Sequence, residues 1–557
     1  MRAFPVGRIS GRTLDALVTA VRKTPARGVL AGLLRAELGI DALRALPHEL
    51  RGPLPFSHAP LAARASHERS SQGLDAPDTQ GTERSAAALA KAYRSGESSP
   101  VQVALRAFGF ARELAGRVPT LGPLCGYDDA RALRAAQDSQ ERITRGAARP
   151  LEGIPITVKE EIDLFGFPTR KGTGYAGFQP AAADALAVAR LRTAGAVILG
   201  QTPMTEFGLS PLGANPHRRM PMNPHDTSRL AGGSSTGGAV AVSLGLCPMS
   251  LGTDGGGSIR IPAAHCGIFG LKPSYGRIPS SGLGTPFATS VVHLGPLARS
   301  SSDLARFLEV ASGADPADDA SRLAPAFATD ELTQALGRGV RGLRIGVEPD
   351  EWSAASPAIR RAGEAALQAL SREGATLVEV RSPLMRWAGA IGYLTLGIEG
   401  FLALARVRKE HMDELGLDVQ LVLAGIETFC PDDYLDAQRL RSSLRRELAE
   451  LLRDVDVLAL PSTGQGPLSV ADEEARYGFI DPKALQATCR FAFLANVSGL
   501  PAASAPVGLD DDGLPIGLQI IGDAWDEACV LQVLAHLERI GVARPPRPAS
   551  ALDLLSR

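Results

Sequence analysis

The sequence predicts an α/β fold: a single large domain with a mixed, mainly parallel central sheet covered by helices on both faces, plus a helical N-terminal extension. Strand-like and helix-like segments alternate along most of the 557 residues, which is typical of strands joined by crossover helices. A proline-rich and then polar stretch at about 48–84 separates this alternation from a helical start. We therefore expect an extension and linker over 1–84 and one domain over 85–557.

The start of the chain has apolar residues at helical spacing. Two helices are expected there, one marked by Leu14, Leu17, Val18 and Val21 and the other by Leu30, Leu33 and Leu34. The segment from about 48 to 84 is expected to be a linker or a loosely ordered arm. Removing 1–84 should leave catalysis of small substrates intact, because no motif described below lies in it.

The domain begins with a helix in which Ser99 suits the N-cap and Pro100 the first helical position. Further helices are expected over "AADALAVARLRTAG", from about Pro357, over 383–454 and at the C-terminal end. Extended segments are expected at "GIPITVKE", "AVILG", "GLRIGV", "ATLVEV", "DVLALP" and "LPIGLQIIG".

Composition limits the classes of function. A net charge of −1 gives no electrostatic reason to bind nucleic acid or anionic lipid. The chain has no apolar run of about 18 residues and no apolar segment typical of a secretory signal at its start, so we expect a cytoplasmic protein without membrane contact. Six cysteines without C-x-x-C pairs predict neither a zinc site nor a disulfide framework. His217 and His225 lie in a polar loop and are expected to face solvent.

The glycine-rich segment "LGTDGGGSIR" at 251–260 is the first candidate for chemistry. A phosphate loop would need a lysine after the glycines, and none follows. A dinucleotide fingerprint would need a third glycine where Arg260 stands. The remaining interpretation is a serine, Ser258, presented among bare backbone amides. We expect Asp254 and Arg260 to brace this loop rather than react.

Two other segments could supply partners for Ser258. "GGSS" at 232–235 is a second glycine-serine cluster, and Lys159 lies in the predicted strand "GIPITVKE", on the face opposite Ile154, Ile156 and Val158. A lysine buried in a sheet has a lowered pKa, so its neutral amine can act as a base. We expect no carboxylate close to Lys159 and a pKa well below the ordinary lysine value.

Lys159, "GGSS" and "GTDGGGSIRIPAAHCGIFGLKPSYGR" at 252–277 together resemble the amidase signature family, and the similarity extends over roughly 85–545. The resemblance implies a Ser–cis-Ser–Lys triad, with Ser258 as nucleophile, Ser234 as the cis-serine and Lys159 as base. It also implies an oxyanion hole built from the backbone N–H groups of Gly255, Gly256, Gly257 and Ser258, with no cofactor and no metal.

This sequence departs from the family pattern beside the triad. Glu160 stands where aspartate is usual, and Thr236 and Gly238 replace a small residue and a serine. Ser235, directly after Ser234, is a second hydroxyl that could serve as the relay.

The implied activity is hydrolysis of the C–N bond of a small to medium linear amide through a serine acyl-enzyme. Alternatives are the glutaminase component of a tRNA-dependent amidotransferase and a non-catalytic binding protein. The pocket is expected from 204–220 and 383–430, where "RWAGAIGYLTLGIEGFLALA" is apolar and favours aryl or alkyl acyl groups. The expected partner is a small-molecule amide, and a homodimer is the assembly considered.

Overall fold

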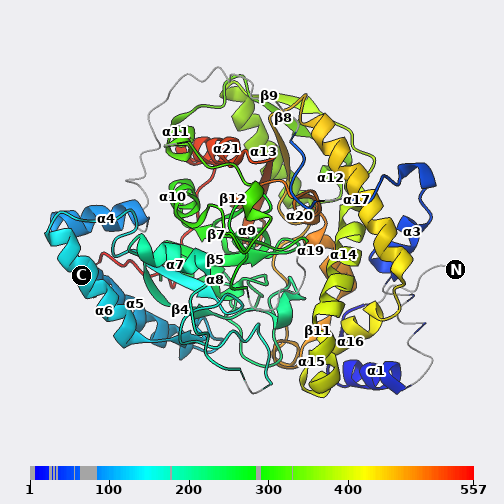
Figure 1. Ribbon diagram of the computed structural model, residues 1–557, viewed down its shortest axis with the longest axis horizontal. Helices are drawn as coiled ribbons and strands as arrows, with labels where there is room; N and C mark the ends of the chain where they lie inside the picture. The colour runs from blue at the N-terminus through cyan, green and yellow to red at the C-terminus, as the bar shows by residue number, and fades with distance from the viewer. Residues whose placement is uncertain are drawn as a thin grey trace.

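A central sheet flanked by helices forms the body of the molecule (Figure 1). The structure is a computed structural model that describes residues 7–23, 28, 32, 35–55, 57–62, 85–175, 178–283, 290–328 and 330–556. The predicted α/β fold with a mixed sheet is confirmed.

The sheet has 11 strands, and its pairing changes across its width. Neighbours are parallel in β4–β3–β5 and in β10–β8–β9, and the remaining neighbours are antiparallel. All six segments predicted as extended are strands here. The spatial order is β2 (Gly126–Tyr127), β4 (Val197–Thr202), β3 (Pro155–Lys159), β5 (Met249–Asp254), β7 (His293–Ala298), β6 (Phe269–Lys272), β12 (Ala502–Leu509), β13 (Pro515–Gly522), β10 (Val457–Pro461), β8 (Arg344–Val347) and β9 (Thr376–Glu379).

Helices occupy the segments that the periodicity indicates. The Ser99 side chain accepts a hydrogen bond from the Gln102 N–H, and Pro100 opens the helix, as predicted. The helices of the domain are α4 (Ala86–Ser95), α5 (Pro100–Ala115), α6 (Asp129–Thr144), α7 (Leu186–Thr193), α8 (Thr236–Leu244), α9 (Arg260–Cys266), α10 (Ser301–Ala311), α11 (Glu331–Gly337), α12 (Pro349–Ser353), α13 (Pro357–Arg372), α14 (Ala388–Ala403), α15 (Ala405–Glu410), α16 (Leu417–Ile426), α17 (Pro431–Leu451), α18 (Asp472–Tyr477), α19 (Pro482–Cys489), α20 (Phe493–Ser498) and α21 (Glu527–Arg539).

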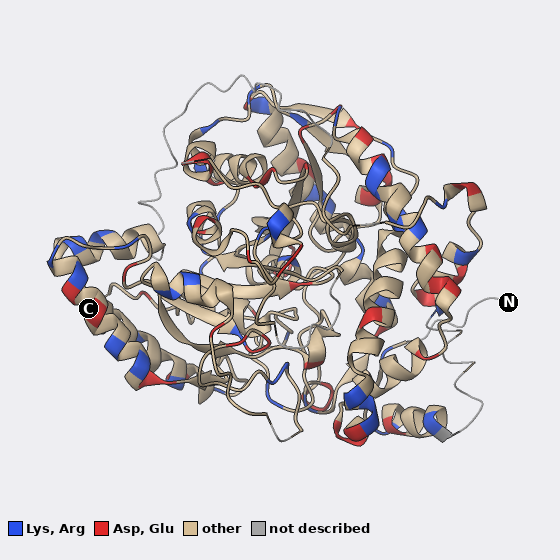
Figure 2. Ribbon diagram, in the orientation of Figure 1, with Lys and Arg blue, Asp and Glu red and all other residues tan. Residues whose placement is uncertain are grey.

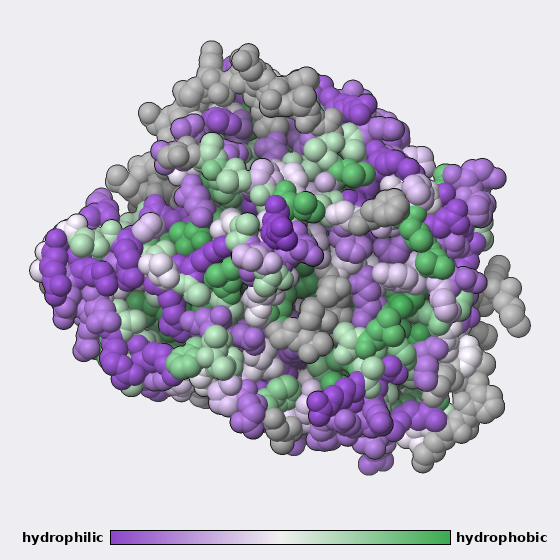
Figure 3. All heavy atoms as spheres, viewed as in Figure 1, coloured by the Kyte–Doolittle hydropathy of each residue, from purple (hydrophilic) through white to green (hydrophobic). Residues whose placement is uncertain are grey.

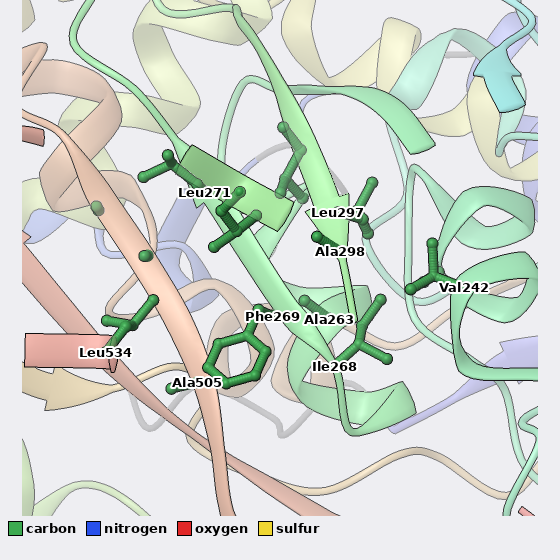
Figure 4. Packing of buried hydrophobic residues seen from close by; sticks show 14 of the residues in the cluster. Val242, Ala263, Ile268, Phe269, Leu271, Leu297, Ala298, Ala505 and Leu534 are labelled. Atoms are coloured by element: carbon green, nitrogen blue, oxygen red, sulfur yellow. The ribbon is translucent and has the colours of Figure 1, made fainter. Parts of the chain in front are cut away.

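The core lies where the antiparallel centre of the sheet meets its helices (Figure 4). Phe269 and Leu271 of β6 and Leu297 of β7 are fully buried. They belong to one cluster with Val242 of α8 and Leu534 of α21, which are also fully buried. Close packing of this kind holds backbone positions firmly, so β5, the neighbour of β7, gives the residues at its end a rigid base.

The N-terminal extension contains α1 (Gly11–Lys23), as predicted, and the short helix α3 (Ile40–Arg44). The strand β1 (Ile9–Ser10) pairs with β11 (Phe479–Ile480) in a separate two-stranded sheet. Leu30, Leu33 and Leu34, which mark the second predicted helix, lie outside the described residues.

Part of the segment predicted as a linker packs on the domain. Arg445 of α17 donates hydrogen bonds to the carbonyl oxygens of Ser57, at 2.7 Å, and Ala59. Arg439 of the same helix donates to the Gly52 carbonyl at 3.0 Å. The described residues around 52–59 therefore run along α17.

The surface carries both signs of charge. Figure 2 shows basic and acidic residues interspersed along the outer helices, in accord with the net charge of −1. On the face in Figure 3 a hydrophobic area lies between the places of α14 and α16 in Figure 1. Within the described ranges, no helix combines the length and apolarity needed to cross a bilayer. All six cysteines are free thiols.

Candidate active site

Lys159 is the last residue of β3, and Thr253 lies near the end of the neighbouring strand β5. The two strands are parallel, so their carboxyl ends meet at the same edge of the sheet. The Lys159 Nζ donates to Thr253 Oγ1 at 2.8 Å and to Ser234 Oγ at 2.7 Å. The lysine is fully buried. The fold thus brings two of the three predicted triad residues into direct contact.

The segment before α8 distinguishes the two adjacent serines. The peptide bond between Gly233 and Ser234 is cis. The Ser234 hydroxyl contacts Lys159, whereas the Ser235 hydroxyl donates to the Thr253 carbonyl at 3.2 Å. Ser234 is therefore the hydroxyl placed on the lysine.

Ser258 stands between β5 and α9, and its carbonyl accepts a hydrogen bond from the Ser235 N–H at 3.2 Å. Its exposed fraction is 8%, against 2% for Ser234 and 0% for Lys159. Ser258 and Ser234 both line one large pocket. The exposed fraction therefore rises from Lys159 through Ser234 to Ser258.

Two of the glycines before Ser258 occupy positions that a larger residue could not take, one because a side chain packs against it and the other because its φ angle is positive. A Cβ on Gly256 would lie 2.6 Å from the Phe493 ring, and Gly257 has a φ of 113°. The Gly257 N–H donates to Asp254 Oδ1 at 2.7 Å. Among the described residues, no hydrogen bond engages the N–H groups of Gly255, Gly256 or Ser258.

The ion pair between Asp254 and Arg260 holds this loop in place, and both side chains are fully buried. Arg260 Nη2 lies 2.9 Å from Asp254 Oδ1 and also donates to Asn496 Oδ1 at 2.6 Å. Asn496 returns hydrogen bonds to Asp254 through its side-chain amide. Burial alone would raise the pKa of Asp254, but the Arg260 guanidinium and the hydrogen bonds hold that pKa well below its usual range. The predicted bracing role of Asp254 and Arg260 is confirmed, and Asn496 is the member that sequence reasoning missed.

One prediction about Lys159 is wrong: a carboxylate does lie close to it. Glu161 Oε1 is 2.9 Å from Lys159 Nζ, although the turn after β3 gave no sign of this contact. Burial is the largest influence on Lys159 and lowers its pKa, while Glu161 acts in the opposite direction. The pKa remains below the ordinary lysine value, as predicted.

The residues that depart from the family pattern make defined contacts. Glu160 accepts a hydrogen bond from the Met204 N–H at 3.0 Å and pairs with Arg218 at 3.1 Å. Thr236, the first residue of α8, donates to the Gly232 carbonyl at 2.8 Å. These contacts fix the two loops that approach Lys159 and Ser234 from outside the sheet.

The prediction that His217 and His225 face solvent is wrong for both residues. His217 Nε2 lies 2.7 Å from Glu206 Oε1. His225 Nε2 lies 3.1 Å from the Cys266 carbonyl. Both rings are half-buried, because the loop that carries them folds back on the domain.

The pocket in front of Ser258 has mainly apolar walls. The two predicted wall segments are confirmed: 206–212, and α14 with α16 and the residues after it. Sequence reasoning missed a third wall, from 479 to 493, and one residue of the N-terminal extension, Leu38. Apolar residues of the wall include Phe207, Leu209, Leu212, Tyr393, Leu396, Val419, Val422, Ile426, Phe429, Phe479, Ile480, Leu485 and Phe493.

Comparison with known proteins assigns the chain to a family. A family model described as "Amidase" matches residues 120–531. The chain belongs to the amidase signature family. It is accordingly an amidase, a hydrolase of amide C–N bonds.

Relatives of this amidase differ in the amides that they are named for. It is 34% identical over 476 residues to a fatty acid amide hydrolase of Oryza sativa subsp. indica, covering 84% of this chain and 78% of the relative. It is 36% identical over 444 residues to a component of the glutamyl-tRNA(Gln) amidotransferase of Chloroflexus aggregans, covering 75% and 88%. The solved structure of a peptide amidase from Stenotrophomonas maltophilia superposes with a TM-score of 0.70 at 27% identity, covering 84% of this chain and 99% of that one.

The charges along the amidase pocket are of one sign. The charged residues that line it are Glu161, Glu206, Asp418 and Asp481, and no arginine or lysine is found among its described lining residues. Asp418 is 9% exposed, and burial followed by the nearby Glu206 raises its pKa to about 7. The described lining therefore offers apolar surface and carboxylates, two of which are paired with cations that do not line the pocket, Glu161 with Lys159 and Asp481 with Arg8.

Proposed function

We propose that this amidase cleaves linear amides through a serine acyl-enzyme, with Ser258 as nucleophile, Ser234 as relay and Lys159 as base. The observation that carries the proposal is the 2.7 Å contact between buried Lys159 and Ser234, which lines the same pocket as Ser258. A hydroxyl nucleophile is weak until an adjacent base takes its proton.

In the proposed acylation step, neutral Lys159 takes a proton from Ser234 while Ser234 takes one from Ser258. The Ser258 oxygen bonds to the acyl carbon and gives a tetrahedral intermediate. When the C–N bond breaks, the proton returns through Ser234 to the leaving nitrogen. A water molecule then attacks the acyl carbon while one of its protons passes through Ser234 to Lys159. The bond between the acyl carbon and the Ser258 oxygen breaks, the acid leaves, and the proton returns through Ser234 to the Ser258 oxygen.

The oxyanion of the tetrahedral intermediate needs hydrogen-bond donors that are already in place. Gly255, Gly256 and Ser258 supply N–H groups with no acceptor among the described residues. The N–H of Gly257, the other glycine predicted for this role, is held by Asp254, and we propose that this bond fixes the loop that presents the rest.

For the substrate, we propose an amide with an apolar alkyl or aryl acyl group. The apolar walls stabilise such a group by removing its surface from water. The fatty acid amide hydrolase of Oryza sativa is a relative whose name fits this chemistry.

The similarity to an amidotransferase component keeps glutamine hydrolysis as the second candidate. Free glutamine carries a carboxylate, which needs a cationic or strongly donating partner when it is taken out of water. The described lining of this pocket has four carboxylates and no arginine or lysine, so it disfavours glutamine.

The test compares purified protein on hexadecanamide, an acetyl anilide and glutamine, with Ser258→Ala as the control. We expect release of the acid from the apolar amides and, with hydroxylamine present, formation of the acyl hydroxamate. Turnover of glutamine alone would instead support the amidotransferase role, and turnover of none by the folded protein would support a non-catalytic role.

A further inference from the structure

We infer that the N-terminal extension forms the outer wall of the acyl pocket and that Leu38 within it limits the length of the acyl group that is accepted. The inference rests on the proposed function. Its basis is that three elements of the pocket wall, β11, α16 and α14, are each covered by a segment of the extension.

The first covered element is β11. Ile9 and Ser10 of β1 pair with Ile480 and Phe479, which both line the pocket. Arg8, just before β1, lies with its guanidinium 5.0 Å from the centre of the Phe479 ring. A strand of two residues has little stability alone, so β1 holds β11 in its place.

Arg8 also makes ion pairs around β11. Its Nε lies 3.2 Å from Oδ2 of Asp481, another pocket residue, and its Nη1 lies 3.1 Å from Glu474 Oε2. The side chain of Arg8 is 28% exposed, so these pairs are partly shielded from water. One residue of the extension thus contacts both an aromatic and an acidic residue of the wall.

The second covered element is α16, a helix whose residues are mostly apolar and buried. Such a helix is normally buried on all sides. Val419, Val422 and Ile426 face the pocket, while Leu421 and Ala424 pack on α1. The partners on α1 are Leu14, Val18 and Val21, each nearly fully buried.

The third covered element is α14, which supplies Tyr393, Leu396 and Gly397 to the pocket. Leu38 itself lines the pocket, and Ile40 and Leu43 of α3 are buried in the main core. Arg44 of α3 binds both carboxylate oxygens of Asp433 in α17, at 2.7 and 2.8 Å. Figure 1 shows α1 and α3, in blue, beside the yellow helices α14 to α17.

These contacts give the extension a place in substrate binding but none in the chemical step. No residue before 85 touches Lys159, Ser234 or Ser258 among the described contacts. A short acyl group is therefore expected to be indifferent to the extension. A long acyl group would reach the wall that contains Leu38.

The experiment enlarges Leu38. Leu38→Trp fills part of the pocket, and Leu54→Trp is the matched control, because Leu54 also belongs to the extension but is 48% exposed and does not line the pocket. The measurement is kcat/KM for acetyl and hexadecanoyl amides of the same aromatic amine. We expect Leu38→Trp to lower kcat/KM for the hexadecanoyl substrate by at least about tenfold, with the acetyl substrate unchanged.

A second variant guards against misfolding of the first. Leu38→Ala enlarges the pocket where Leu38 limits the acyl chain, so we expect it to raise kcat/KM for the hexadecanoyl substrate while the acetyl substrate keeps its kcat and KM. The inference would be overturned if the ratio of kcat/KM for the hexadecanoyl substrate to kcat/KM for the acetyl substrate stayed unchanged in both Leu38 variants. It would also be overturned if Leu54→Trp changed this ratio as much as Leu38→Trp does. Failure of the parent protein to cleave either amide would instead count against the proposed function.

Discussion

Lys159 Nζ lies 2.9 Å from Glu161 Oε1, so the proposed base has a counter-ion inside the protein. An ammonium group buried without such a partner would be costly. The carboxylate makes the charged form tolerable in the resting enzyme, and burial keeps the neutral form within reach. The two opposing influences set the pH at which the amine becomes a base.

Glu161→Gln is expected to lower the pKa of Lys159, because a negative neighbour that favours the ammonium form is removed. The acid limb of kcat/KM against pH should move to lower pH, since more of the amine is then neutral at a given pH. Asp319→Asn is the control, because the Asp319 side chain is 97% exposed, whereas Glu160 and Asp254 are also negative neighbours that raise the pKa of Lys159. If the acid limb of the kcat/KM profile stays at the same pH in Glu161→Gln, a group other than Lys159 controls that limb.

Lys159→Arg is expected to abolish activity, although the positive charge is kept. A guanidinium does not give up its proton in proteins, so it cannot act as the base. The loss should be in kcat and should exceed about a hundredfold, the usual contribution of general base catalysis. Lys159→Ala should also lose most activity, together with the acid limb of the pH profile. Near-normal turnover by Lys159→Arg would make the lysine an electrostatic support only.

Ser258→Ala is expected to leave a folded protein with amidase activity near background. A fluorophosphonate probe should add its mass to the peptide that contains Ser258 in the parent protein and not in the variant. Ser235→Ala is a matched control, because its hydroxyl contacts the Thr253 carbonyl rather than Lys159. Probe mass on a different serine would refute the nucleophile assignment.

The order of strands and helices could be predicted because it depends on local periodicity. Lys159 at the end of β3 and the Ser234 and Ser258 loops could likewise be located from motifs. The contact of Glu161 with Lys159 could not, since it depends on how the turn after β3 folds back. Asn496 is bound to Asp254 across more than two hundred residues, and no local pattern encodes such a contact.

The role of the extension was unpredictable for a related reason. Helical spacing shows that Leu14 and Val18 must be buried, but it does not identify the element against which they pack. Only the fold shows that the partner, α16, has its other side on the pocket. The domain boundary predicted near 85 stays a prediction, and the pocket includes residues from both sides of it.

Asp418→Asn is expected to stabilise the protein at alkaline pH. Burial, and then Glu206, raises the pKa of Asp418 to about 7, whereas an unfolded aspartate titrates near ~3.9. The folded state therefore binds the proton more tightly, and stability falls as pH rises between these two values. Asparagine has no such charge to bury, so the gain should be near zero at pH ~4 and on the order of 1–3 kcal/mol at pH ~8.

The measurement is the denaturant midpoint of unfolding from pH ~4 to pH ~8, for the parent, for Asp418→Asn and for a control variant. Asp319→Asn is the control, because the Asp319 side chain is 97% exposed. The expected pattern is a parent curve that declines through neutral pH, an Asp418→Asn curve that is flatter, and an Asp319→Asn curve that follows the parent. In the structure, Asp418 Oδ1 is buried and has no hydrogen-bond partner among the described residues. Parallel curves for the parent and Asp418→Asn would contradict this, because they would show that Asp418 titrates like an exposed carboxyl.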